Sequence, residues 1–541
     1  MDIEVRTSKQ LLLRFCQRVD ALRGGRLSMV ASAVVLASAL MPCMATQVAA
    51  ATESTQNTGR LSTIDNDLLD DISRRSFRYF WDNTDPRTGL VLDRAQFDGK
   101  QGDVTWHQDV SSIAATGFGL TALCIAARHR WVSPVLARQR IRTALRFFAY
   151  HAQQENGWFY HFLDARTGKR RWKSEISSID TALLLAGVLT ARQAFPDDPE
   201  IVRLANLIYD RVDFPWMLDG NHLFLSHGWK PETGFLPYRW DTYSEAGILY
   251  ILAIGSPTHP ISPDAWFGWK LPVVHSAGYT YIGGGPLFIQ QYSQAWLDLR
   301  NRSYLQVPME DRVVPRVNVF ENAIVATRAQ QALGIDLSQR YRGYSSKVWG
   351  ITASDSAKGY VAWGGSPDDS RIDGTVVPSA SAGSAMFAPD ICIPALRAML
   401  LKYGRNIYGR YGFADAFNPT TGWVSRYVIG IDVGITLLSA EDLRTGNVWR
   451  WFMGNTEVDR ALDMIGLVAG SPADGKQAGR DVAEAREETS GLNTGKRRAD
   501  EGAAQDIQIG ARYRIPASAF KFKIPVPPQQ AEETQPRTQP K

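Results

Sequence analysis

The chain is poor in the residues that build disulfide-stabilised and zinc-dependent proteins. It has 541 residues but only four cysteines and eight histidines. Cys16 and Cys43 lie among the first fifty residues, which leaves Cys124 and Cys392 for the folded part, too few for a disulfide framework. We expect both of these thiols to be buried and unpaired. The histidines show neither a His-Glu-x-x-His nor a His-x-His spacing, so we expect no metal site.

Two further catalytic patterns are missing. No Gly-x-Ser-x-Gly segment is present, so nothing indicates the nucleophile elbow of a serine hydrolase. Gly283–Gly285 is followed by Pro286 and not by the Lys-Ser/Thr pair of a phosphate-binding loop, which favours a simple turn. The sequence therefore predicts neither a nucleotide-binding site nor a cofactor.

Charge of one sign is also scarce. Only 21% of the residues are charged, and 60 basic side chains face 55 acidic ones. Six of the basic and three of the acidic side chains lie in the first fifty residues, so the remainder is close to neutral. A nucleic-acid-binding surface needs clustered, uncompensated cations to displace counterions from phosphates. We therefore expect no nucleic-acid partner.

The first fifty residues read as an export signal. A basic stretch ends at Arg26, an uncharged run from Leu27 to Ala51 follows, and small residues close it. A retained signal anchor is the alternative, because 25 uncharged residues can just span a bilayer. Several Ser, Thr and Pro residues make that run a poor permanent span. We expect residues 1–51 to be removed, with no stable membrane association afterwards and a periplasmic or secreted protein.

The end of the chain differs in composition from the middle. From about residue 470 the sequence is dominated by Gly, Ala, Glu, Lys and Arg, and it ends in a Pro- and Gln-rich stretch. Such a segment carries too little apolar surface to offset the entropy of ordering it. We expect residues 470–541 to form a solvated tail and residues 61–467 to form the folded domain.

The folded part repeats one pattern. Asp109–Gly117 (DVSSIAATG) and Glu175–Leu183 (EISSIDTAL) are nearly the same segment, and looser copies follow near Glu245, Glu321, Ala380 and Asp432. Each copy leads into an apolar stretch, typical of a helix buried on all sides. Amphipathic stretches, for example 135–151 and 199–212, alternate with them. The pattern predicts an all-α fold, an (α/α)6 toroid of six helical hairpins, with short β-hairpins and loops at the end where the acids lie.

Aromatic residues and acids should meet at that end. The chain has 16 Trp, 19 Tyr and 22 Phe, many of them in Gly-rich connections. Aromatic faces stack on sugar rings, and glycoside hydrolysis needs two carboxyl groups in different environments. The alternative interpretation is that these acids cap helix N-termini, above all at Asp109 and Glu321. The candidate acids are Asp109, Glu175, Asp180, Glu245, Glu321 and Asp432.

Four segments resemble a known family. They are residues 241–260 (DTYSEAGILYILAIGSPTHP), 286–296 (PLFIQQYSQAW), 350–355 (GITASD) and 373–375 (DGT). They are similar to the glycoamylase-like domain, which includes the bacterial endo-β-1,2-glucanases of glycoside hydrolase family 144. The resemblance covers about residues 61–453. It implies an (α/α)6 barrel, a β-linked glucan substrate and hydrolysis with inversion of the anomeric centre, without a metal.

The resemblance also implies roles for individual residues. Glu245, in the family's Tyr-Ser-Glu string, would be the general acid, and Asp432 would activate water as the general base. Glu175 would bind substrate hydroxyls. The motifs and their neighbourhood supply further candidates for substrate binding, namely Asp109, Asp180, Trp240, Tyr243, His259, Gln291 and Trp296.

The chain departs from the family pattern beside the presumed base. It reads Ile-Asp-Val-Gly-Ile at 431–435, where relatives commonly have Ile-Asp-Gln-Gly-Pro. A missing Gln amide predicts an altered subsite or water position. Alternatives to an endo-acting glucanase are therefore an exo-acting or transglycosylating enzyme and a non-catalytic glycan-binding protein.

Overall fold

The computed structural model of the protein describes residues 61–100, 107–304, 317–364 and 369–469. The predicted leader 1–51 and tail 470–541 lie outside these ranges. Within them the chain is rich in helix, with short strands only. None of the described helices combines the length and apolarity needed to cross a bilayer. Cys124 and Cys392 are buried and unpaired, as predicted.

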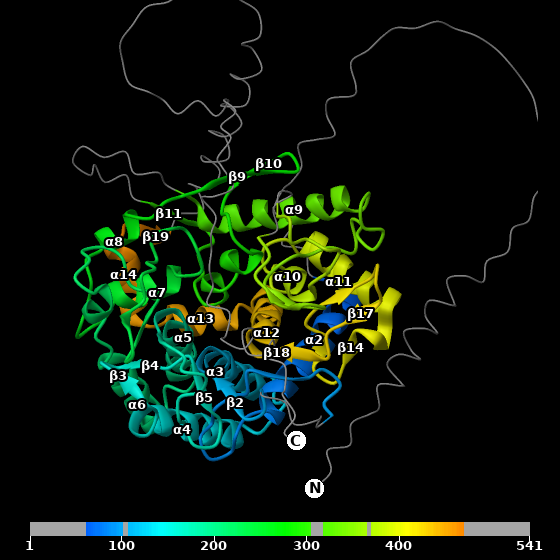
Figure 1. Cartoon of the computed structure of the whole chain (residues 1–541). Coiled ribbons are helices and arrows are strands. Elements are labelled where there is room, and N and C mark those ends of the chain that lie inside the picture. Colours follow the sequence, from blue (N-terminus) through cyan, green and yellow to red (C-terminus); the bar gives the residue numbers. More distant parts are fainter. Residues whose placement is uncertain (1–60, 101–106, 305–316, 365–368, 470–541) are drawn as a thin grey trace, which may run out of the picture. The chain divides into compact units, whose positions relative to one another are not determined.

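Four helices lack a polar face and are almost wholly buried. They are α3 (Ile113–Arg128), α5 (Ser178–Ala194), α7 (Gly247–Ile254) and α12 (Gly430–Thr445). Figure 1 shows α3, α5 and α12 near the centre of the helical part, with α4 and α6 outside them. An all-round apolar sequence forces such helices into the interior, which is the place predicted for them.

Two inner positions hold single turns in place of long helices. One holds the 3₁₀ turns η2 (Leu287–Gln290) and η3 (Ser293–Ala295), and the other holds the five-residue α10 (Pro378–Ala382). Helix α3 packs against α5, α5 packs against α7, and α7 packs against η3. Helix α12 contacts η3, α10 and α3. The Gln291 side chain donates to the Ala380 carbonyl (2.9 Å) and joins the two short positions. The ring closes with six inner segments, so the (α/α)6 fold is confirmed.

The outer helices bury one face each. They include α4 and α6, close to the amphipathic stretches predicted at 135–151 and 199–212, and α9, which begins at the acidic signature around Glu321. That signature was expected to open an inner helix, but about half of α9 faces outward and Glu321 is exposed. The outer and C-terminal helices are α2 (Thr63–Asp82), α4 (Pro134–Tyr150), α6 (Pro199–Asp210), α8 (Asp264–Phe267), α9 (Val319–Leu337), α11 (Pro389–Tyr403), α13 (Asn447–Met453) and α14 (Thr456–Met464).

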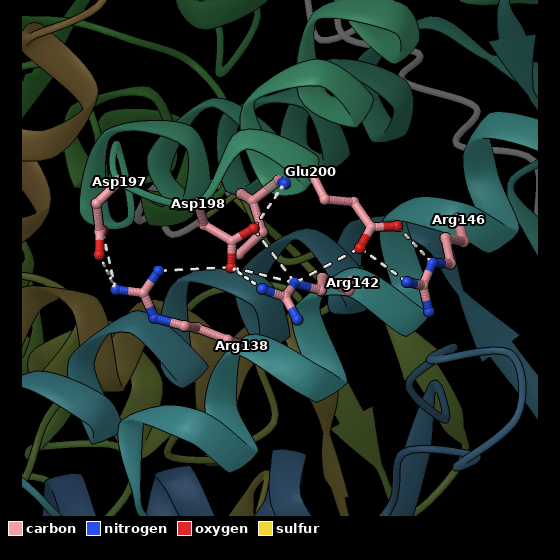
Figure 2. A network of polar contacts seen from close by, with 7 residues as sticks. Arg138, Arg142, Arg146, Asp197, Asp198 and Glu200 are labelled. Carbon is pink, nitrogen blue, oxygen red and sulfur yellow. Dashed lines mark hydrogen bonds and ion pairs between the residues drawn. The ribbon is translucent and has the colours of Figure 1, made fainter.

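A row of ion pairs joins α4 to the start of α6 (Figure 2). Three arginines spaced four residues apart lie on one face of α4. Asp198 is central, because it accepts from Arg142 (2.6 Å) and also caps α6 by accepting the Ile201 N–H (3.3 Å). These ion pairs hold the outer helices α4 and α6 together at the protein surface. Its members are Arg138, Arg142, Arg146, Asp197, Asp198 and Glu200.

The described strands form small antiparallel sheets, and several of them lie at the N-terminal ends of the inner helices. Strands β2, β6 and β18 run directly into α3, α5 and α12, so their partners gather at one end of the ring. This end is called the mouth below. The pairs are β1 (Arg94–Gln96) with β18 (Tyr427–Ile429), β2 (Val110–Ser112) with β5 (Phe162–Asp164), β3 (Gln154–Glu155) with β4 (Trp158–Phe159), β6 (Ile176–Ser177) with β7 (Gly228–Lys230) and β8 (Gly234–Phe235), β9 (Val273–Ser276) with β10 (Tyr279–Ile282), β11 (Arg302–Tyr304) with β19 (Leu467–Ala469), β12 (Ser354–Ser356) with β13 (Gly359–Val361), β14 (Tyr408–Gly409) with β15 (Gly412–Phe413), and β16 (Phe417–Asn418) with β17 (Trp423–Val424).

Helices α3 and α5 approach backbone to backbone. A Cβ added at Gly187 would overlap the Gly117 carbonyl, and one added at Gly117 would overlap the Leu183 carbonyl. Neither carbonyl can swing away as a flexible side chain could. The two glycines therefore set the distance between the first two inner helices.

We predict that Gly187→Ala destabilises the protein. The new methyl group must push two helices apart, an overpacking cost of about 1–3 kcal/mol that exceeds the gain of at most about 1 kcal/mol in helix propensity. Denaturant unfolding followed by circular dichroism measures the change. Gly285→Ala is the control, because its Cβ would make only ordinary contacts at 3.4 Å. Equal stability of the Gly187 variant and the parent would contradict this packing.

Candidate active site

Glu245 lies in the turn that precedes α7. The Ser293 hydroxyl donates to its carbonyl oxygen (2.5 Å) and accepts the Ile248 N–H (2.9 Å), which ties this turn to η3. Burial raises the pKa of Glu245 to about 7, and the charge of Asp180 acts in the same direction. No cation is among the groups that act on this carboxyl. Glu245 therefore holds a proton near neutral pH, the form that a general acid needs.

Asp432 occupies the first turn of α12 and is 6% exposed. Burial raises its pKa to about 7, and the negative charges of Asp355 and Asp93 add to the rise. Two hydrogen bonds oppose it, one from the Ser379 hydroxyl to Oδ1 (3.3 Å) and one shared with Asp415. Asp432 is thus buried but keeps hydrogen-bonding partners for its charged form.

An arginine supports this side of the mouth. Arg94 in β1 donates to Asp93 (3.1 Å) and to Asp355 (3.2 Å). The Asp355 carboxylate also accepts from the Ser425 hydroxyl (3.0 Å), and its backbone N–H donates to Asp415 Oδ2 (2.7 Å). Burial lowers the pKa of Arg94, but the charges of Asp93 and Asp355 outweigh it and raise the value overall. The guanidinium therefore stays charged and fixes both aspartates.

A histidine bridges two acids on the opposite side. His161 Nδ1 lies 2.9 Å from Glu175 Oε1, and Nε2 lies 3.5 Å from Asp180 Oδ1. Its ring stacks on Phe162 with centroids 3.8 Å apart. Ser177 Oγ caps α5 by accepting the Asp180 N–H (3.2 Å) and donates to the Asp180 carboxylate (2.5 Å).

The pKa values of His161, Glu175 and Asp180 shift in different directions in this bridge. Burial alone would lower the pKa of His161, but the Asp180 and Glu175 charges raise it to about 9. Burial alone would raise the pKa of Glu175, but the His161 hydrogen bond and charge lower it to about 2. For Asp180 burial prevails and the pKa is raised. A charged His161–Glu175 pair therefore stands beside a carboxyl that readily takes up a proton.

Glu245 and Asp432 both lie within electrostatic reach of Tyr292. Besides burial, the charges of both acids raise the pKa of the Tyr292 phenol. Asp180 acts on Glu245, and Asp93 acts on both Asp432 and His161. Acids that are up to 339 positions apart in the chain, from Asp93 to Asp432, thus lie within electrostatic reach of one another at the mouth.

Two of the predicted aromatic residues lie beside the acids. The Trp240 indole donates to Ser178 Oγ (2.9 Å) at the start of α5 and stacks on His227, with centroids 3.8 Å apart. The Tyr243 hydroxyl, two residues before Glu245 in the chain, donates to Gln290 Oε1 (2.7 Å). Both side chains are buried beside α5 and η2, and their predicted contact with sugar remains a prediction.

Four predicted substrate-binding residues lie where another role explains them. Trp296 is fully buried against Phe118, and Gln291 uses its amide to join η2 to α10. His259 is exposed beyond the C-terminal end of α7, the end opposite Glu245. Asp109 forms an ion pair with Arg166. Trp296 and Gln291 are buried and His259 is exposed, so their predicted contact with substrate stays a prediction that these positions do not favour.

The sequence interpretation missed several polar residues at the mouth. Asp355 lies in the segment 350–355 used for the resemblance, but no role was given to it. Asp415 lies in the segment 412–417, and no role was predicted for it. No role was predicted for His161, and its pairing with Glu175 and Asp180 was not recognised. Among the described residues no group of three or more His, Cys, Asp or Glu side chains is arranged to hold a metal ion.

We predict that His161→Gln destabilises the protein in a pH-dependent way. The raised pKa of His161 provides stability that is complete below about pH 6.5 and is lost as the pH rises through about 9. The lowered pKa of Glu175 provides stability that is complete above about pH 4.5 and is lost as the pH falls through about 2. The loss on substitution should therefore be largest at pH 4.5–6.5, about 1–3 kcal/mol, and smallest above pH 9.

Melting temperatures from pH 4.5 to 9.5 measure this difference. His259→Gln is the matched control, because that histidine is exposed. A difference for His161→Gln that does not change with pH would show that the imidazole acts by packing alone.

Known proteins resemble the chain over this whole region. A sequence model for glycoamylase, described as "Putative glucoamylase", matches residues 237–456. An exo β-1,2-glucooligosaccharide sophorohydrolase (non-reducing end) from Parabacteroides distasonis is 27% identical over 441 residues, 74% of this chain. The match spans 58% of that relative's own length.

Two solved structures share the fold. An endo-β-1,2-glucanase from Chitinophaga pinensis, in complex with sophorotriose and glucose, is 27% identical, with a TM-score of 0.68 over 76% of this chain and 100% of that one. A β-1,2-glucanase from Parabacteroides distasonis is 26% identical, with a TM-score of 0.67 over 75% of this chain and 60% of that one. The ring of inner segments, the acids at its mouth and these matches agree with the resemblance predicted from the motifs, and the chain is similar to the glycoamylase-like family.

Proposed function

We propose that the protein is an exported glycoside hydrolase that cleaves β-1,2-glucan internally and inverts the anomeric centre. The observation that carries the proposal is the pair of acids Glu245, which is half-buried, and Asp432, which is buried: both act on the Tyr292 phenol and both retain protons to near neutral pH. The β-1,2 linkage is supported by the names of the relatives from Parabacteroides distasonis and Chitinophaga pinensis. Export is supported by the leader pattern of residues 1–51.

The proposed reaction assigns one proton movement to each acid. Glu245 donates its proton to the glycosidic oxygen as the bond from that oxygen to the anomeric carbon breaks. Asp432 takes a proton from a water molecule whose oxygen forms the new bond on the opposite face. One water is consumed, and the hydroxyl on the new reducing end has the opposite configuration. His161, charged between Glu175 and Asp180, is placed to hold those acids toward substrate hydroxyls.

We predict that Glu245→Gln abolishes most activity without unfolding the protein. An amide fills the same space but cannot donate a proton to the leaving oxygen, and a positioned acid contributes about 10²- to 10⁴-fold. Reducing ends released from β-1,2-glucan by leaderless protein measure the loss, and glucan binding should remain. Glu321→Gln is the matched control, because that carboxylate is exposed on α9. Unfolding of the Glu245 variant would instead show a structural role.

Internal cleavage gives a second prediction. An endo-acting enzyme should release a mixture of oligosaccharides from long β-1,2-glucan at early times. An exo-acting enzyme, the alternative suggested by the name of the Parabacteroides distasonis relative, would release one short product from the start. Chromatography of products over time separates the two outcomes. Binding of glucan without any new reducing ends would favour a glycan-binding protein in place of an enzyme.

A further inference from the structure

Asp415 places a second buried carboxyl beside Asp432. It lies between β15 and β16 and is 4% exposed. Its Oδ2 accepts the backbone N–H of Asp355 (2.7 Å), which fixes the orientation of the carboxyl. Its Oδ1 is buried and receives no hydrogen bond from any N–H or hydroxyl donor of the described residues. Oδ1 is therefore the atom left to face Asp432.

A small cavity adjoins both carboxyls. Its lining includes Asp415 and Asp432 together with Ser379 and Thr436. The Ser379 hydroxyl lies 3.3 Å from Asp432 Oδ1, so one side of the base is already occupied by a neutral donor. A second carboxyl on the other side can hold Asp432 only if a proton lies between the two oxygens.

No cation is paired directly with Asp415, although the charge of Arg94 reaches it. The nearest arginine, Arg94, already donates to Asp93 and Asp355, and Asp415 forms no ion pair in the described part of the chain. The phenols of Tyr292 and Tyr360 lie within electrostatic reach, and both stay neutral because burial raises their pKa. Burial and the charges of Asp432 and Asp355 raise the pKa of Asp415 well above its ordinary value. Two like charges in one dry site cannot both form.

We propose that Asp415 is the positioning residue of the base: it keeps one proton on Oδ1, donates it as a hydrogen bond to Asp432, and so orients the ionised Asp432 toward the attacking water. This inference rests on the proposed function. Asp415 exchanges no proton with substrate or water during the cycle. The Asp355 N–H and the Arg94–Asp355 ion pair act through Asp415 by holding its other oxygen.

Two substitutions separate positioning from catalysis and from mere packing. The side-chain amide introduced by Asp415→Asn can accept the Asp355 N–H and donate permanently to Asp432, so this variant should keep at least about one tenth of kcat. Asp415→Ala removes the donor, so kcat should fall by about 10- to 100-fold while KM changes less. Asp336→Asn, exposed on α9, is the control.

The pH profile of kcat/KM adds a readout that packing would not move. In the parent the acid limb reports ionisation of the Asp432–Asp415 pair, near pH 7. Asp415→Ala should move that limb to higher pH, because the hydrogen bond that favours the charged Asp432 is gone. Asp415→Asn should leave it within a few tenths of a pH unit. A folded Asp415→Asn variant as inactive as Asp432→Asn would overturn the proposal, as would an unmoved acid limb in Asp415→Ala.

Infrared spectroscopy tests the shared proton without any activity. At pH 8, the difference spectrum of parent minus Asp415→Asn should contain the carbonyl band of a protonated carboxylic acid. Absence of that band would refute the inference even if the enzyme cleaves glucan. If the band is present but the protein releases no reducing ends, the shared proton is supported and the proposed hydrolase activity is refuted. The two failures are therefore distinguishable.

Discussion

Burial of carboxyl groups at the mouth controls the chemistry of this molecule. Each acid that leaves water must gain either a cation or a proton, because an isolated charge in a dry site is too costly. Glu175 gains His161 and stays ionised, and Asp355 gains Arg94. Glu245 has no such partner and keeps a proton, while Asp432 and Asp415 share one. Different partners thus separate ionised from protonated acids at one end of the ring.

The ring of inner segments brings these acids together. Its long members α3, α5, α7 and α12 start at the same end, each after a short strand or turn that carries polar residues. Helix N-termini present unpaired N–H groups, which favour nearby carboxylates. The caps at Ser112 and Ser177 show the same arrangement twice. The serines of the repeated signature therefore have a structural origin as helix caps, while its acids at Asp109 and Glu175 pair with Arg166 and His161.

The repeat and the all-apolar helices made the inner ring predictable from sequence, because α3 and α5 can be stable only when buried. The signature at Glu321 misled for a physical reason: α9 carries exposed polar residues along one face, and the fourth inner position is filled earlier by η2 and η3. Contacts between residues on different segments of the ring could not be predicted from the sequence. Nothing near Asp415 in the chain indicates Asp432, and nothing near Trp296 indicates that Phe118 and Thr121 cover it.

Unpaired acids at the mouth lower the stability of the folded state, so the cost must be offset elsewhere. The tight contact of α3 with α5 through Gly117 and Gly187, and the row of ion pairs centred on Asp198, lie away from the acids of the mouth. Such rigid packing keeps the first turns of the inner helices fixed while the acids lose water. A looser ring would let water reach Glu245 and Asp432 and return both pKa values toward those of exposed carboxyls. Precision in the packing of the barrel is thus a condition for the proton that Glu245 holds.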